Sequence, residues 1–402
     1  MNKKISLGSA LILASFFALL TFMLTFVNIN RVYNRILADT ELSDRITHKL
    51  AEIDREVRKN FIGEIDNQKL IDSIAEGFVR GLGDRYAEYM SAERYMEHIK
   101  LNQGRMVGIG VEVMLNEHRG GVIEVTNVYA YSPAETGGML IGDYIYKVEG
   151  ELVSALGYVE AVDRVRGEEG TQVMLTILRG EGHTEEVELT FTREVVQVQT
   201  VRYELMQGNV GYIKIRDFNR ETPNEFKAAL DALAGLGADR YIFDVRNNPG
   251  GDLQGITETL DYLLPEGPII RIYYANGREE VIYSSQASEL IAPMVVLINE
   301  NTASAAELFS AALKDYEKAT LIGVITFGKG TVQTINRLSD NSALKISSAR
   351  YAPPFSENYD GVGVAPHIEV VLDEELRRVR VERLTLEQDA QLREALRVLS
   401  GY

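Results

Sequence analysis

Apolar runs alternate with amphipathic stretches between residues 202 and 372, and this alternation constrains the fold more than any other feature. The apolar runs predict strands at 210–215, 241–245, 294–298 and 320–324. The amphipathic stretches predict helices at 223–236, 253–264 and 305–316. Strands that alternate with helices are typical of an α/β domain, whose functional loops lie at the carboxyl ends of the strands.

Three loops of this region carry residues that can do chemistry. NENTASAAELFSAAL contains Ser304 at the start of a predicted helix, and TFGKGTVQT contains Lys329 and Gln333. FDVRNNPGGDL adds Gly250 and Gly251. Together they offer a nucleophile, a base that is not histidine, a residue that can orient this base, and backbone N–H groups for an oxyanion. Because acyl transfer needs these parts, we predict a serine peptidase of the Ser-Lys type.

Ser304 also has a purely structural interpretation. With Glu307 it matches a capping box, in which a serine side chain closes the first turn of a helix. The two interpretations are compatible, because the positive end of the helix dipole favours the charge of a tetrahedral intermediate. Small neighbours leave room for a peptide to approach: Ala303, Ala305 and Ala306.

Lys329 lies between two glycines, so it could equally be a solvated lysine on a turn. As a base it must be neutral, and lowering its pKa toward the working pH costs about 3–5 kcal/mol of lost charge stabilisation. No arginine or lysine lies nearby in the sequence, so we expect desolvation to lower the pKa. Apolar neighbours fit this expectation: Ile322, Val324, Ile325, Phe327 and Val332.

Gln333 is the predicted partner that aims the lysine amine. In a straight strand, residues four apart face the same way but lie about 13 Å from each other. Contact therefore needs a bend, which Gly328 and Gly330 permit. The alternative is an ordinary surface glutamine on a strand.

The oxyanion site is predicted from Gly250, Gly251 and Ala305. The two glycines present backbone N–H groups without side chains in the way, and Ala305 follows the candidate nucleophile. Taken alone, NNPGG is also a plain Asn-Pro-Gly turn.

Residues 104–193 change to short strands and resemble a PDZ domain. The order Gly-Ile-Gly-Val, Ser-Pro-Ala-x-x-x-Gly and Gly-Asp-x-Ile carries the resemblance, whereas a lone Gly-x-Gly is usually a tight turn. Gly108 and Gly110 allow a nest of N–H groups for a carboxylate. A peptide would add as a strand beside Val111 to Val113, against a helix with Val159. The predicted peptide-binding residues are Ile109, Gly110 and Val111.

The amino-terminal run from Ile5 to Val27 is almost free of charge and follows Lys3 and Lys4. As a helix it would be roughly 35 Å long, enough to span a bilayer. It lacks small residues at its end, so we expect an uncleaved anchor rather than a cleaved signal peptide or a buried core helix. This predicts a single-pass protein of the cell membrane with an extracytoplasmic catalytic body.

Amphipathic helices are predicted at both ends of the remaining chain. Residues 40–82 repeat apolar side chains at helical spacing, and so do the last thirty residues. These helices either pack on their own domain or pair with a second chain. The second alternative predicts a homodimer.

Composition excludes several functions. The formal net charge of −17 disfavours nucleic acid as a partner. The chain has no cysteine, so disulfides, thiolate catalysis and zinc–cysteine sites are excluded. None of the five histidines lies near the Ser304 or Lys329 motifs, and we predict no metal and no organic cofactor.

Residues 68–400 resemble the carboxyl-terminal processing peptidases. In that family, segments like those quoted carry the nucleophile, the base and its partner, which correspond to Ser304, Lys329 and Gln333, and a segment like DVRNNPGG contributes to the oxyanion site. Two positions depart from the family pattern: His367 replaces the usual acid, and Thr302 stands where glycine or serine is more typical.

The resemblance implies an endopeptidase that cuts protein substrates near their carboxyl termini and is gated by its PDZ domain, with Arg166 in the gate. It also implies a protease core like the Clp and crotonase folds, and dimerisation through terminal helices. Two rival functions remain: a PDZ scaffold with an inactive protease fold, and a crotonase-like acyl-CoA enzyme. The predicted regions are an anchor at 1–35, a helical region at 36–103, a PDZ domain at 104–195, a protease core at 196–372 and a helical arm at 373–402.

Overall fold

The computed structural model describes residues 17, 21, 23, 43–116, 122–180, 182–274, 277–286, 288–379 and 381–401. The chain forms two compact units, residues 1–71 and 72–402. In the first unit, residues 43–60 are helical, and helix α2 (Asn67–Arg80) begins there and ends in the second unit. The helices predicted between residues 40 and 82 are therefore present.

The predicted membrane anchor at residues 5–27 is corrected by the structure. A helix that crosses a bilayer needs about 20 mostly apolar residues. Within the described residues, none of the helices combines the length and the apolar character that this requires. Of the predicted segment, only Phe17, Thr21 and Met23 are described, and the rest lies outside the described residues. The prediction of a single-pass protein of the cell membrane is thus wrong.

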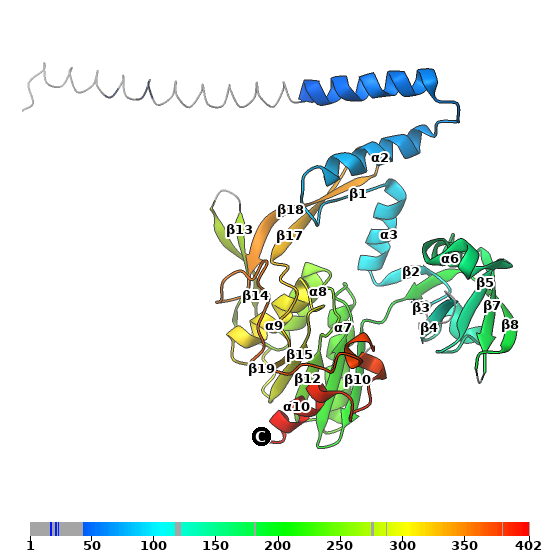
Figure 1. The fold of residues 1–402 in the computed structure, drawn as a ribbon. Helices are drawn as coiled ribbons and strands as arrows, with labels where there is room; N and C mark the ends of the chain where they lie inside the picture. The colour runs from blue at the N-terminus through cyan, green and yellow to red at the C-terminus, as the bar shows by residue number, and fades with distance from the viewer. Residues whose placement is uncertain are drawn as a thin grey trace, which may run out of the picture. The chain divides into compact units, whose positions relative to one another are not determined.

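A six-stranded sheet forms the centre of the second unit, as the α/β pattern predicts (Figure 1). Its first strand is antiparallel to its neighbour, and the remaining pairs are parallel. The strand order is β10 (Val201–Met206), β11 (Val210–Ile215), β12 (Arg240–Asp244), β15 (Met294–Ile298), β16 (Ala319–Gly323) and β19 (Ile368–Glu369).

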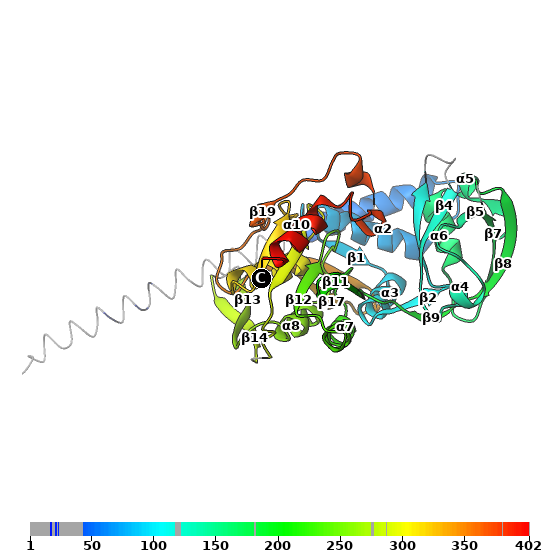
Figure 2. The same ribbon diagram turned by 90° about the horizontal axis from the view of Figure 1, so that it is seen from below.

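Helices cover both faces of this sheet because its strands are apolar on both sides. Phe243 packs on one face with helices α7 (Thr222–Gly235), α8 (Leu253–Asp261) and α9 (Ala305–Asp315). Its neighbour Ile242 faces the opposite way and packs with helix α10 (Ala390–Leu399), which crosses that face (Figure 2). The carboxyl-terminal helix thus completes the core of this unit.

A second sheet is built around its central strand, β18 (Ala343–Ala352). Strand β17 (Thr331–Arg337) pairs along β18 from Ala343 to Arg350 and occupies one of its edges. Strands β1 (Glu88–Met90) and β13 (Gly267–Tyr274) therefore share the other edge, and β14 (Glu279–Ser285) extends the sheet beyond β13. Helix α3 (Ala92–Asn102) follows β1.

The region predicted as a PDZ domain contains a separate sheet. Its order is β3 (Val111–Asn116), β4 (Val122–Val128), β5 (Tyr144–Val148), β7 (Gln172–Arg179) and β8 (Glu185–Thr192), with β6 (Glu151–Leu152) on β5. Strands β2 (Arg105–Gly108) and β9 (Glu194–Gln197) pair with each other. Helices α4 (Pro133–Thr136), α5 (Val153–Leu156) and α6 (Tyr158–Val165) complete this region. Strand β3 lies at an edge of its sheet.

A buried ion network holds the end of β12 against the carboxyl-terminal helix. Arg246 is 1% exposed and binds Asp244 at 2.6 Å and Asp389 at 2.8 Å. Lys214 and Tyr212 also donate to the Asp244 carboxylate. Burial alone would raise the pKa of Asp244, but Arg246 and Lys214 hold it below its ordinary value. The network anchors the loop that leads from β12 to Gly250.

We predict that Asp389→Ala destabilises this unit strongly. The change leaves the buried Arg246 guanidinium without one of its two carboxylates, which costs about 3–5 kcal/mol in comparable pairs. Urea denaturation followed by circular dichroism should show a lower midpoint. Arg397→Ala is the control, because it breaks an exposed ion pair on the same helix and should leave the midpoint unchanged. A wild-type midpoint for Asp389→Ala would contradict the prediction.

Candidate active site

Loops that follow three neighbouring strands of the central sheet meet at its carboxyl edge. The loop after β12 carries Gly250 and Gly251, the loop after β15 carries Ser304, and the loop after β16 carries Lys329. Gly250 has φ +109, and a Cβ atom there would lie 2.7 Å from Ser304 Cβ. The glycine loop and the candidate nucleophile are therefore packed against each other, and a larger residue than glycine would clash.

Ser304 has an unusual backbone conformation, with φ 56° and ψ −118°. An ordinary N-cap residue lies in the extended region, and a non-glycine residue at positive φ costs about 1–3 kcal/mol. Such strain persists only where the surroundings impose it, and it gathers at functional sites. The capping-box interpretation holds as well, because Ser304 is the N-cap of α9 and exchanges the reciprocal contacts with Glu307, and the catalytic role of Ser304 stays a prediction.

The Glu307 carboxylate joins the segments of Ser304 and Lys329. It is fully buried, and one of its oxygens, Oε2, accepts hydrogen bonds from the backbone N–H groups of Ser304 and Lys329, both at 2.8 Å. Its other oxygen, Oε1, accepts from Gly328 N at 2.6 Å and from Thr326 Oγ1 at 2.5 Å. The sequence suggested only a capping partner here, because the contact across 22 residues depends on the fold.

Two of the three predicted oxyanion donors are available. In the described part of the chain, the N–H groups of Gly251 and Ala305 donate no hydrogen bond. The N–H of Gly250 instead donates to Asn248 Oδ1 at 2.8 Å. Asn248 also donates to the carbonyl of Ile215 and so fixes the loop to β11. Gly250 therefore shapes the loop, and the role of Gly251 and Ala305 as oxyanion donors stays a prediction.

Lys329 is half-buried, and its ammonium lies 4.6 Å from the centre of the Tyr86 ring. Within the described ranges, its Nζ atom donates no hydrogen bond, so Lys329 and the Ser304 hydroxyl are not joined in this structure. Burial lowers the pKa of Lys329, as expected, but the positive charges of Lys345 and Arg85 lower it further. Sequence reasoning missed both cations because they come from distant segments.

Gln333 lies on β17 and contacts its own strand and β18. Its Nε2 atom donates to Thr331 Oγ1 at 2.9 Å and to Ser347 Oγ at 3.4 Å. A bulge between Val332 and Gln333 supplies an irregularity near the position where a bend was expected. No contact between Gln333 and Lys329 is formed among the residues that the structure describes, so its role stays a prediction.

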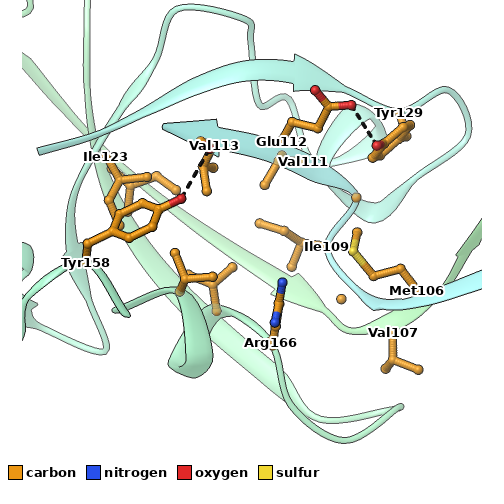
Figure 3. Close-up of a pocket in the computed structure, with 15 residues that line it drawn as sticks. Met106, Val107, Ile109, Val111, Glu112, Val113, Ile123, Tyr129, Tyr158 and Arg166 are labelled. Carbon is orange, nitrogen blue, oxygen red and sulfur yellow. Dashed lines mark hydrogen bonds between the residues drawn. The ribbon is translucent and has the colours of Figure 1, made fainter. Parts of the chain in front are cut away.

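A groove of about 300 Å³ lies beside β3 (Figure 3). The predicted peptide-binding residues Ile109, Gly110 and Val111 line it, and so does Arg166. Gly110 has φ +83, and a Cβ atom there would come within 2.3 Å of Ser132 Cβ, so only glycine fits. Arg166 pairs with Glu97 at 3.4 Å, and both side chains are about half exposed.

The residues that the structure describes bring together no group of three or more side chains suited to a metal ion. The carboxyl edge of the central sheet brings together the side chains and amides already named. A hydroxyl, an amine of lowered pKa and two free N–H groups are parts that acyl transfer uses.

We predict that Glu307→Gln lowers kcat/KM by about 100-fold, the effect of roughly 1 Å of misplacement. An amide would present an NH₂ group to N–H donors that now meet a carboxylate oxygen. The change should shift both Ser304 and Lys329. Hydrolysis of labelled casein measures the effect, and circular dichroism verifies the fold. The exposed Glu317→Gln, just beyond the carboxyl end of α9, is the matched control. Equal activity of the two variants would contradict the prediction.

Comparisons with known proteins agree with this geometry. The model of peptidase family S41 matches residues 209–370, and a PDZ domain model matches residues 124–179. The chain is 34% identical over 326 residues to carboxy-terminal processing protease CtpA of Bacillus subtilis (strain 168), covering 81% of this chain and 69% of that protein. It is 33% identical over 328 residues to the carboxy-terminal-processing protease of Bartonella bacilliformis, covering 80% and 74%.

A solved structure, the putative S41 protease from Bacteroides fragilis, shares the fold with a TM-score of 0.56 and 18% identity, over 81% of this chain and 90% of that chain. The resemblance to the carboxyl-terminal processing peptidases that the sequence motifs indicated is confirmed. The chain belongs to peptidase family S41 and is a serine peptidase with a PDZ domain.

Proposed function

We propose that this serine peptidase cleaves protein substrates near their carboxyl termini, with Ser304 as nucleophile and Lys329 as general base. The observation that carries the proposal is the strained backbone of Ser304, which starts α9 directly against the glycine loop. Relatives named carboxy-terminal processing proteases support the substrate class.

The proposed reaction has two halves. The neutral Lys329 amine takes the proton of Ser304 Oγ, which attacks the scissile carbonyl carbon. The N–H groups of Gly251 and Ala305 stabilise the resulting oxyanion. The Lys329 ammonium then protonates the leaving amine, which departs as the C–N bond breaks, and an acyl-enzyme remains. Water hydrolyses this ester with Lys329 again as base.

Lys329 has to turn toward Ser304 for this reaction, because its amine lies against Tyr86 in the present structure. Gln333 is the proposed partner that would hold the turned amine. Catalytic hydrogen bonds are often long or absent in unliganded enzymes and tighten when substrate binds. The proposal therefore places the productive geometry in the substrate complex.

The groove beside β3 is the proposed site for a substrate carboxyl terminus. A peptide can add to the β3 edge, and the N–H groups near Ile109, Gly110 and Val111 would receive its carboxylate. Glu112 of the same strand forms an ion pair with Arg216, which follows β11 of the protease core. This pair supports a proposed coupling between groove and active site, with Arg166 as the gate residue.

Homodimer formation through the terminal helices stays a prediction. It is supported by the exposed apolar side chain of Ile53 on the helix at residues 43–60. The rival prediction, a scaffold without activity, is opposed by the membership of the chain in peptidase family S41. The following experiments test the proposed roles of Ser304 and Lys329.

We predict that Ser304→Ala abolishes hydrolysis of fluorescein-labelled β-casein. The variant lacks the hydroxyl that forms the acyl-enzyme, but the fold should persist because only one oxygen is removed. Residual cleavage would be several orders of magnitude lower, as in other enzymes that lose a nucleophile. Wild-type rates in Ser304→Ala, with contaminating protease excluded by repurification, would refute the assignment.

We predict that kcat/KM for β-casein rises with pH through the pKa of Lys329. Only the neutral amine accepts a proton, and burial together with Lys345 holds this pKa below the ordinary value of 10.5. The rise should therefore occur below pH 10.5 and level off above the Lys329 pKa. Lys329→Arg should be inactive at every pH, because guanidinium stays charged. An active Lys329→Arg enzyme would exclude Lys329 as the base.

A further inference from the structure

The turn between α2 and β1, residues 83–87, contacts the active-site sheet through Asp84. On the edge of β18 that β1 and β13 share, residues 343–345 pair with β1 and residues 349–352 pair with β13. The N–H of Ser347 lies in the gap and donates to Asp84 Oδ2 at 2.9 Å. The Asp84 carboxylate thus accepts the hydrogen bond that a neighbouring strand would otherwise accept from Ser347. This hydrogen bond holds the turn against β18.

The same carboxylate also orders the turn itself and reaches toward Gln333. Asp84 Oδ1 accepts from Tyr86 N at 2.9 Å and from Ser347 Oγ at 3.2 Å. Ser347 Oγ in turn lies 3.4 Å from Gln333 Nε2. Burial would raise the pKa of Asp84, but hydrogen bonds from Tyr86 and Ser347 hold this pKa below its ordinary value. Asp84 is therefore an ionised carboxylate at neutral pH.

Tyr86 occupies the space next to the Lys329 amine. The Lys329 and Arg85 cations each lie 4.6 Å from the centre of its ring. The ring is half-buried, and its hydroxyl is buried without a hydrogen-bond partner among the described residues. Lys329 therefore contacts the face of the Tyr86 ring and forms no hydrogen bond with the Tyr86 hydroxyl.

We propose that Tyr86 is a positioning residue of the peptidase: its ring shields the Lys329 amine from water and limits the directions in which this side chain can turn. Asp84 supports Tyr86 by fixing the turn. The inference rests on the proposed function, because Tyr86 can position a catalytic group only if Lys329 is the general base.

The effect of the Tyr86 ring on the pKa of Lys329 has to be separated from the effect of the surrounding charges. Lys345 of β18 and Arg85 of the turn disfavour the ammonium, whereas Glu307 of α9 and Asp84 of the turn favour it. These charges oppose one another, and burial is the largest cause of the lowered pKa of Lys329. A ring face stabilises a cation by about 0.5–1 kcal/mol at exposed sites. We expect the exclusion of water to outweigh this, so that loss of the ring raises the pKa.

The test is the pH dependence of kcat/KM for fluorescein-labelled β-casein in the full-length protein. Tyr86→Ala should move the rising limb to higher pH by about one unit and lower kcat/KM roughly tenfold at pH values below the limb. Activity should recover at alkaline pH. Tyr86→Phe keeps the ring and removes only the unpartnered hydroxyl, so it should follow the wild type. Tyr131→Ala removes a tyrosine that is 93% exposed and is the control.

Asp84→Glu provides a second route to the same result, because its longer side chain misplaces the turn but keeps the carboxylate charge that acts on Lys329. Its limb should move in the same direction, and the double variant should move no further than Tyr86→Ala alone. An unmoved limb in Tyr86→Ala, or a Tyr86→Phe limb that moves as far as that of Tyr86→Ala, overturns the inference.

Failure of the proposed function has a different signature. If Ser304→Ala or Lys329→Arg cleaves β-casein at the wild-type rate, the Ser-Lys mechanism is wrong whatever Tyr86 does. If both are inactive and the Tyr86→Ala limb coincides with the wild type, only the role of Tyr86 is wrong.

Discussion

The buried carboxylate of Glu307 is the interaction on which the active site depends. It receives the N–H groups of Ser304, Gly328 and Lys329 and the hydroxyl of Thr326. A carboxylate without these four donors would be too costly to bury, and the donors without it would leave buried N–H groups unsatisfied. The carboxylate and its donors therefore stabilise each other, and they hold the Ser304 segment and the Lys329 segment together.

Three features of the candidate active site depend on this connection between the Ser304 and Lys329 segments. The Ser304 backbone can remain in its strained conformation because the Glu307 carboxylate and the neighbouring glycine loop surround it. The N–H groups of Gly251 and Ala305, which donate no hydrogen bond in the described part of the chain, lie on the two segments that meet at Ser304. In the proposed mechanism the Lys329 side chain has to move, since its amine lies against the Tyr86 ring.

Much of this arrangement could be predicted from the sequence because its signals are local. The helix after Ser304, the glycines at 250 and 251 and the strands before them follow from short-range patterns, and the PDZ motifs occur in order within residues 108–145. The capping-box pattern also identified Glu307, but as a partner of Ser304 alone.

The remaining features depend on contacts between distant segments. Asp84 and Ser347 are 263 residues apart, and Arg246 and Asp389 are 143 apart, so no window of sequence could join them. For the same reason the expectation that only desolvation lowers the Lys329 pKa missed Lys345 and Arg85. The predicted membrane anchor is contradicted, because no helix of the described residues is long and apolar enough to cross a membrane.

The most direct test of the central claim is a crystal structure of the enzyme with a peptide boronate bound to Ser304 Oγ, which imitates the tetrahedral intermediate. The account predicts that Lys329 Nζ leaves the Tyr86 ring face and lies about 2.6–3.2 Å from Ser304 Oγ, with a boronate oxygen on the N–H groups of Gly251 and Ala305. A boronate adduct in which the Lys329 amine stays against Tyr86, or points into solvent, would contradict it.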